Sequence, residues 1–312
     1  MNFWTIQKYK FFIITIVLPY SLFFSLLPVE GFSDRVSYLL IAENPLAYLI
    51  HYFRIGGLVG VLTNEPVWFA INLLLSLTFE PEIIIRIIVF VSAFWLGYQL
   101  AKKNPRNLLF VLFIFLYPQI TKNFTIHLRQ GLAITIFFIA LNPYGVRRYP
   151  SIMFLTSFIH SSFFVINFIF FFNYLCDLLK ISSGLRLIVF CFSTLIGINF
   201  LPSVTELLGF RQALQYNFDK VDVGGLGFLL YSGLFILLFH SYSFLKTHSN
   251  AVLVCIFYLL TYFTFPLSAR VLESGLLFIL LAGLDLPKFK KSLFLMIMAS
   301  SSIFAAASAL LL

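Results

Sequence analysis

The sequence predicts an all-α, polytopic integral membrane protein, and its composition is the first reason. Of the 312 residues, 61% are hydrophobic and only 11% are charged, and the mean hydropathy is +0.98. A chain with so few polar residues cannot cover the surface of a soluble globule. The second reason is that Lys and Arg lie in short clusters between apolar runs, the pattern that sets membrane orientation. The net charge of +9 therefore does not indicate a nucleic-acid partner.

The cysteines and the motif content argue against several classes of protein. Cys176, Cys191 and Cys255 lie in or beside apolar runs without CxxC or Cys/His spacing, so we expect neither a disulfide nor a metal site. The sequence has no Walker loop, no HExxH, no GxSxG and no pair of neighbouring Asp residues. ATP-driven work and metal-dependent sugar transfer from a nucleotide donor are disfavoured, and we expect no cofactor.

The N-terminal basic residues set the predicted orientation. Lys8 and Lys10 place the N-terminus in the cytoplasm, so the first span runs outward over residues 11–27. Residues 28–82 carry more acids than bases, which is expected of a segment on the outer side.

Two apolar stretches within this outer segment are shorter or less regular than ordinary spans. Pro45–Thr63 is interrupted by polar residues and by the Gly56–Gly57 pair, and residues 66–79 are short. We interpret both stretches as interfacial or re-entrant helices, which also preserves the orientation of everything downstream.

The rest of the chain alternates between apolar runs and basic turns, which gives about eleven transmembrane helices in one domain over residues 1–312. Residues 150–180 are long for one span and tight for two. A helical hairpin turning at residues 160–162 places Lys180 and Arg186 inside, whereas a single span places both outside, and the positive-inside rule favours the hairpin. The main outer loop is expected at residues 202–225. The remaining spans are expected at residues 83–101, 107–120, 123–141, 185–201, 226–245, 251–265 and 271–284, and in the C-terminal run.

The expected helix at residues 123–141 carries Arg129 within its first two turns, where a charge is costly in hydrocarbon and often marks function. Asn123 and Thr125 are placed to cap this helix, and Gly131 allows a neighbouring element to approach closely. The guanidinium beside Gln130 suits a phosphate or a carboxylate held in two places. The alternative is that Arg129 snorkels to outer headgroups.

Two acids upstream are candidates for chemistry. Asp34 and Tyr38 are four residues apart, which places a carboxylate and a phenol on one face of a helix. Asp34 could act as a general base, or it could be an interfacial charge near Arg35. Glu65 precedes a proline that can begin a helix, which is also ordinary capping chemistry.

Two further candidates lie downstream. His160 stands beside two serines at the expected turn, where it could act in catalysis or serve as a structural hydrogen-bonding group. Arg270 could bind an anion, or it could pair with Glu273 along one helix.

These residues together resemble a known family. The quoted positions are Asp34-x-x-x-Tyr38, Glu65–Pro66, Asn123 with Arg129–Gln130–Gly131-x-Ala133, and Phe158-x-His160-x-Ser162. In order and spacing, over residues 33–162, the chain resembles the EpsG-type branch of the Wzy polysaccharide polymerases. The C-terminal half is similar through hydropathy, a polar outer loop and Arg270.

The resemblance implies a GT-C-like polymerase architecture and a metal-independent glycosyltransferase in the bacterial inner membrane, with its active site facing the periplasm. Such an enzyme moves a growing glycan from undecaprenyl pyrophosphate onto another lipid-linked repeat unit of O-antigen or another surface polysaccharide. The implied partners are undecaprenyl-pyrophosphate-linked glycans, membrane lipids and a chain-length regulator of the Wzz type. The expected pyrophosphate ligands are Arg129, Arg270 and Arg211, with support from Tyr38 and Gln130, and the expected bases are Asp34, then Glu65 and His160.

Other classes of membrane protein remain open. A lipid-linked oligosaccharide flippase or other secondary transporter also uses intramembrane charges, but transporters usually contain internal repeats and midplane sites, and this sequence has no convincing repeat. An O-antigen ligase or a membrane acyltransferase is a third class, although a ligase is expected to have a larger outer loop than residues 202–225.

Overall fold

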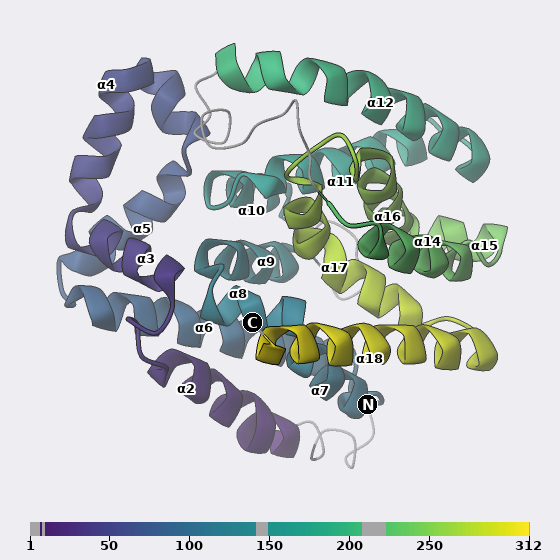
Figure 1. Ribbon diagram of the computed structural model, residues 1–312, viewed down its shortest axis with the longest axis horizontal. Helices are drawn as coiled ribbons and strands as arrows, with labels where there is room; N and C mark the ends of the chain where they lie inside the picture. The colour runs from purple at the N-terminus through teal and green to yellow at the C-terminus, as the bar shows by residue number, and fades with distance from the viewer. Residues whose placement is uncertain (1–6, 8–9, 142–148, 208–222, 312) are drawn as a thin grey trace. The chain divides into compact units, whose positions relative to one another are not determined.

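The computed structural model describes the chain except residues 1–6, 8–9, 142–148, 208–222 and 312, and every regular element in that part is a helix (Figure 1). The all-α class is confirmed there. The chain forms two compact units, Met1–Phe163 and Phe164–Leu312. Lys8, Arg147–Arg148 and Arg211, on which expectations above depend, lie outside the described residues.

Unit 1 is organised around the long helix α6 (Pro81–Lys103), against which α2 and α9 pack. A Cβ at Gly97 of α6 would lie 2.6 Å from both Val17 Cγ1 and Phe115 Cζ, so the glycine allows two neighbours to come close. The other elements of unit 1 are η1 (Ile13–Val17), α2 (Leu18–Leu26), α3 (Ser33–Glu43), α4 (Pro45–Thr63), α5 (Pro66–Ser76), α7 (Leu108–Leu116), α8 (Pro118–Thr125), α9 (Leu128–Ala140), α10 (Pro150–Leu155) and η2 (Thr156–Phe158).

The expected span at residues 107–120 is broken. α7 ends at Leu116, and α8 begins at Pro118 after a bend of 63°. A proline disfavours helical dihedrals at the residue before it, and Tyr117 is extended, with φ −69° and ψ 123°. The two helices together are apolar enough to form one bent span.

The expected helix at residues 123–141 is also interrupted, because α9 begins only at Leu128. The capping role expected of Asn123 and Thr125 is therefore wrong. Each side chain donates to a carbonyl oxygen within α8 at 3.2 Å, and His127 precedes the first residue of α9. The role of Gly131 is confirmed. A Cβ there would lie 3.0 Å from the Asn123 carbonyl carbon and closer still to its oxygen.

α4 has the interruption that the Gly56–Gly57 pair predicts. Both glycines have non-helical dihedrals, and Gly57 has a φ of 58°, which residues with a side chain rarely adopt. The whole helix is long and apolar enough to cross a membrane. The pieces on either side of the kink are each shorter than the roughly 20 residues of an ordinary span, so a re-entrant position remains our interpretation.

The expected hairpin within residues 150–180 is wrong as a pair of full spans. The break falls near His160, as expected, because η2 ends at Phe158 and the next helix begins at Ser162. However, α10 has 6 residues and η2 has 3. Together they rise about 15 Å, roughly half of a bilayer's hydrocarbon thickness.

Unit 2 is built on α16 and α17, which pack along each other. A Cβ at Gly275 of α17 would lie 2.5 Å from Val254 Cγ1 of α16. α12 continues past the expected end of its span at residue 201, so the first residues of the expected outer loop are helical. The first helix, α11 (Ser162–Leu178), begins in the last two residues of unit 1. The others are α12 (Ser183–Leu207), α14 (Leu226–Leu238), α15 (Tyr242–Thr247), α16 (Ser249–Thr261), α17 (Ser268–Leu284) and α18 (Lys288–Leu311).

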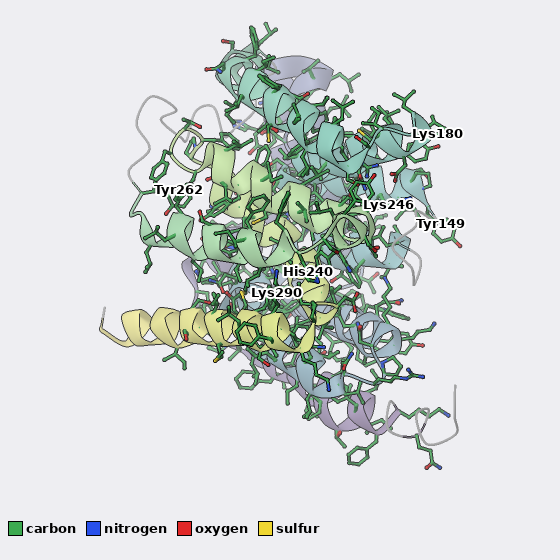
Figure 2. All side chains as sticks on the ribbon, turned by 90° about the vertical axis from the view of Figure 1, so that its right-hand side faces the viewer. Tyr149, Lys180, His240, Lys246, Tyr262 and Lys290 are labelled. Atoms are coloured by element: carbon green, nitrogen blue, oxygen red, sulfur yellow. The ribbon has the colours of Figure 1, made fainter. Side chains whose placement is uncertain are left out.

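Two basic residues that the predicted orientation places inside lie at the same end of unit 2. Figure 2 shows Lys180 and Lys246 at the end opposite to Tyr262, which follows the last residue of α16. The expected span at residues 226–245 ends earlier, at Leu238, and Lys246 belongs to the separate short helix α15.

The surface and the helix lengths both indicate a membrane-embedded protein. Leu109, Leu207 and Phe289 are each more than 80% exposed, and large apolar side chains are exposed along most of the helices. A soluble monomer does not expose so much apolar surface. Among the described residues, three helices are long and apolar enough to span a membrane, or four if α7 and α8 count as one bent span, and six shorter apolar helices accompany them. The number eleven stays a prediction.

α6 and α9 run parallel in unit 1, in agreement with the predicted register, in which both run inward. The Thr135 hydroxyl on α9 donates to the Ser92 carbonyl oxygen on α6 at 2.9 Å. Further along both helices, Lys103 Nζ lies 4.0 Å from the Phe138 ring centroid. The basic end of α6 is thus beside the C-terminal end of α9, and Arg129 lies at the opposite end of α9.

Candidate functional site

The centre of the site is an ion pair between Arg129 and Glu65, 64 residues apart in sequence. Arg129 Nη1 donates to Glu65 Oε2, and the side chains are 12% and 4% exposed. Arg129 is the second residue of α9, so its guanidinium is fixed at a helix end and does not sit on a freely moving surface side chain. The snorkelling alternative does not describe a guanidinium that is buried on a carboxylate.

Glu65 holds the N-cap position of α5, which begins at Pro66 as expected, but its carboxylate does not cap the helix. It precedes α5 with a left-handed backbone, φ 62° and ψ 49°, and makes no side-chain capping hydrogen bond. Its second oxygen, Oε1, instead accepts from the Ser161 N–H at 3.1 Å. Residues in this conformation cost about 1–3 kcal/mol and persist where their surroundings hold them. Glu65 thus connects α9 to the break before α11.

His160 lies in that same break. It is 6% exposed, and its Nδ1 is 2.6 Å from the Ser162 hydroxyl oxygen. The N–H of the next residue, Ser161, donates to Glu65, and Glu65 in turn pairs with Arg129, so Glu65 links the His160 turn to the Arg129 guanidinium. The structure therefore brings three predicted site positions together: Glu65, Arg129 and the His160 turn.

Tyr38 forms the aromatic side of the site. The Arg129 guanidinium carbon lies 5.3 Å from the Tyr38 ring centroid, which is cation–π range. Trp68, which the sequence analysis did not single out, is fully buried and packs edge-on against Tyr38 at 5.4 Å. The two buried rings form an aromatic wall beside the guanidinium.

The guanidinium has donor capacity to spare. Arg129 Nε is buried without a hydrogen-bond partner among the described residues. Buried donors are nearly always satisfied, and the exceptions need an explanation such as a bound ion. A guanidinium held by one carboxylate, with another nitrogen unsatisfied, is suited to receive an anion.

The remaining predicted residues are Asp34, Gln130, Arg270 and Arg211. Asp34 is half-buried in the first turn of α3, and no ion pair or side-chain hydrogen bond of Asp34 is found within the described part of the chain. Gln130 is buried within unit 1. Arg270 lies in α17 of unit 2, so its distance from Arg129 stays a prediction, as does the role of Arg211.

Arg35 is the residue that sequence reasoning missed. It is fully buried, whereas the sequence named it only as the neighbour of Asp34. Neighbouring residues on a helix do not face each other, so Asp34 could not pair with Arg35. A charged residue without a partner on an apolar helix often has a specific role, and this was the sequence signal that pointed to Arg35.

The comparison with known protein families gives one match. Residues 44–310 match the EpsG family, a range that includes Glu65, Arg129 and His160 and begins after Asp34 and Tyr38. No curated protein and no solved structure matches the chain. The match extends through unit 2, where the sequence alone showed little beyond hydropathy. The chain belongs to the EpsG family.

Proposed function

We propose that this chain is a metal-independent membrane glycosyltransferase that polymerises undecaprenyl-pyrophosphate-linked repeat units of O-antigen or another surface polysaccharide. EpsG family membership suggests a polysaccharide polymerase-type function. The observation that carries the finer proposal is the buried Arg129, which is fixed by Glu65 and has an unsatisfied Nε. A pyrophosphate is the anion that this reaction would bring to it.

The proposed reaction uses that guanidinium on the leaving group. An acceptor hydroxyl oxygen attacks the anomeric carbon of the donor glycan, the bond from that carbon to the pyrophosphate oxygen breaks, and the hydroxyl proton passes to a base. Negative charge grows on the phosphate oxygens in the transition state. A fixed guanidinium in a site that excludes water stabilises this charge without reorganising.

Glu65 is the least suited of the three candidate bases. Both of its oxygens are engaged, one by Arg129 and one by the Ser161 N–H, and a carboxylate paired with arginine is a weak base. We assign it to holding Arg129 in place. Asp34, one helical turn from Tyr38 on α3, remains the first candidate, and His160 is the second.

The remaining parts of the proposal concern residues outside the Arg129 site. Arg270 and Arg211 would bind the second carrier pyrophosphate, and Gln130 would support Arg129 from within α9. The protein would lie in the bacterial inner membrane with its N-terminus in the cytoplasm and the Arg129 end of α9 facing the periplasm. A chain-length regulator of the Wzz type would be its partner.

The test uses purified, reconstituted protein and lipid-linked repeat units, without nucleotide or metal. We expect a ladder of longer glycans, and a single band throughout would reject the proposal. Arg129→Ala should lower the rate by about 10²–10³-fold, as expected for loss of a donor to developing negative charge. Arg86→Ala removes an arginine from an exposed pair with Glu82 and is the matched control. A ladder of wild-type length and rate from Arg129→Ala would remove Arg129 from the mechanism.

A further inference from the structure

Arg35 is fully buried and is hydrogen-bonded only to backbone carbonyl groups among the described residues. Its guanidinium donates four hydrogen bonds, and all the acceptors are backbone carbonyl oxygens. They are Thr125 (from Nε, 2.9 Å), Leu27 (from Nη1, 3.0 Å), and Phe24 and Phe124 (both from Nη2, 3.0 and 2.8 Å). Among the described residues no carboxylate forms an ion pair with Arg35.

The four acceptors belong to the ends of two helices. Phe24 lies in the last turn of α2, Leu27 follows that helix, and Phe124 and Thr125 end α8. The last carbonyls of a helix have no intrahelical donor and carry the negative end of its dipole. Where such carbonyls are buried, another donor has to satisfy them. The planar guanidinium of Arg35 therefore caps the C-terminal ends of both helices. The negative ends of the two helix dipoles compensate its buried positive charge in place of a carboxylate.

The capped end of α8 leads directly into the Arg129 site. Only Ile126 and His127 separate α8 from α9, whose second residue is Arg129. Arg35 itself is in α3, three residues before Tyr38, whose ring faces the Arg129 guanidinium. Arg35 is thus bonded to α8, the helix that leads into the one carrying Arg129, and it belongs to α3, the helix that carries Tyr38.

We propose that Arg35 is a positioning residue for the anion site: by fixing the end of α8 against α3, it sets where the Arg129 guanidinium lies relative to Tyr38. The inference rests on the proposed function because it takes pyrophosphate as the anion. Lysine cannot replace Arg35, since one ammonium nitrogen cannot reach carbonyls on both sides as a planar fork does.

The test measures binding of inorganic pyrophosphate to detergent-solubilised full-length protein through the fluorescence of Trp68, which packs on Tyr38. Trp4→Phe and Trp95→Phe leave Trp68 as the single indole. We expect Arg35→Lys to weaken binding about tenfold or more, because a displaced Arg129 loses a hydrogen bond to the charged anion, and such a bond contributes roughly a factor of ten or more. Only folded protein binds pyrophosphate, so the dissociation constant describes the folded molecules. A variant that is merely less stable keeps the same constant. Arg86→Lys, in an exposed pair, should bind as wild type does.

The outcomes separate the two proposals. If Arg129→Ala abolishes binding while folded Arg35→Lys binds as wild type does, the positioning role is wrong and the proposed function stands. If wild-type protein binds no pyrophosphate, both fall. Should Arg35→Lys not fold, Gly131→Ala decides, because its Cβ would push on the Asn123 carbonyl and move the α8–α9 corner with Arg35 intact. Unchanged affinity in that variant would refute the positioning role.

Discussion

Glu65→Gln tests the centre of the site because it removes a charge and preserves the shape of the side chain. The glutamine keeps an oxygen that can accept from the Ser161 N–H, which now lies 3.1 Å from Oε1. What is lost is the negative charge beside Arg129, at a place where the two side chains are only 4% and 12% exposed. The variant therefore separates the ion pair from the hydrogen bond.

The size of the effect follows from burial. Removing one member of a buried ion pair leaves an uncompensated charge and costs about 3–5 kcal/mol of unfolding free energy. The chain also contains a matched exposed pair, Glu82 with Arg86, whose side chains are 52% and 33% exposed. Exposed pairs contribute about 0–1 kcal/mol, so Glu82→Gln should change little. The two glutamine variants should thus differ by about 3 kcal/mol.

The assay is reversible unfolding in mixed micelles, with the ladder assay run on the same preparations. We expect Glu65→Gln to lower both the stability and the polymerisation activity, because the ion pair that holds the Arg129 guanidinium in place is lost. Equal stabilities for Glu65→Gln and Glu82→Gln would show that the pair does not fix Arg129. Glu65→Ala, which also loses the Ser161 contact, should be worse than Glu65→Gln.

Two other predictions concern unit 2. Asn173 accepts from buried Arg186, so Asn173→Ala should cost about 1–3 kcal/mol by leaving a buried donor unsatisfied, whereas Asn199→Ala on the exposed part of α12 should cost little, as measured by unfolding in micelles. Asp285, in the turn after α17 and outside the spanning segments, accepts a hydrogen bond from His248, which holds its pKa below the usual range. Its contribution to stability should be complete above about pH 4 and be lost as the pH falls further, a loss that melting curves of Asp285→Asn should not show.

The positions of several breaks could be predicted from local chemistry. The Gly56–Gly57 pair interrupts α4, and the turn near His160 separates two helices, as expected. Gly131 lacks a Cβ and so allows the Asn123 backbone to come close, which the sequence also predicts. Such features depend on one or two residues and their own dihedrals.

Contacts between distant segments could not be predicted in this way. Hydropathy predicts one helix over residues 123–141, because neither Ile126 nor His127 is a helix breaker. The break between α8 and α9 accompanies the packing of these two helices against each other, which is a tertiary contact. Likewise the Glu65–Pro66 pair has ordinary capping chemistry, and only the tertiary fold turns that carboxylate toward Arg129. Composition also could not show that Arg35 finds four carbonyl oxygens in place of an acid.

The left-handed backbone at Glu65 has a consequence for how α5 is aimed. An acidic residue has little intrinsic reason to adopt a φ of 62°, so the direction in which α5 departs is maintained by what the side chain holds, and those contacts lie on α9 and at Ser161. A ligand that drew Arg129 away would release that backbone toward commoner dihedrals and swing the first turn of α5, together with Trp68. The direction of α5 is in this way coupled to whether an anion is bound at the Arg129 guanidinium.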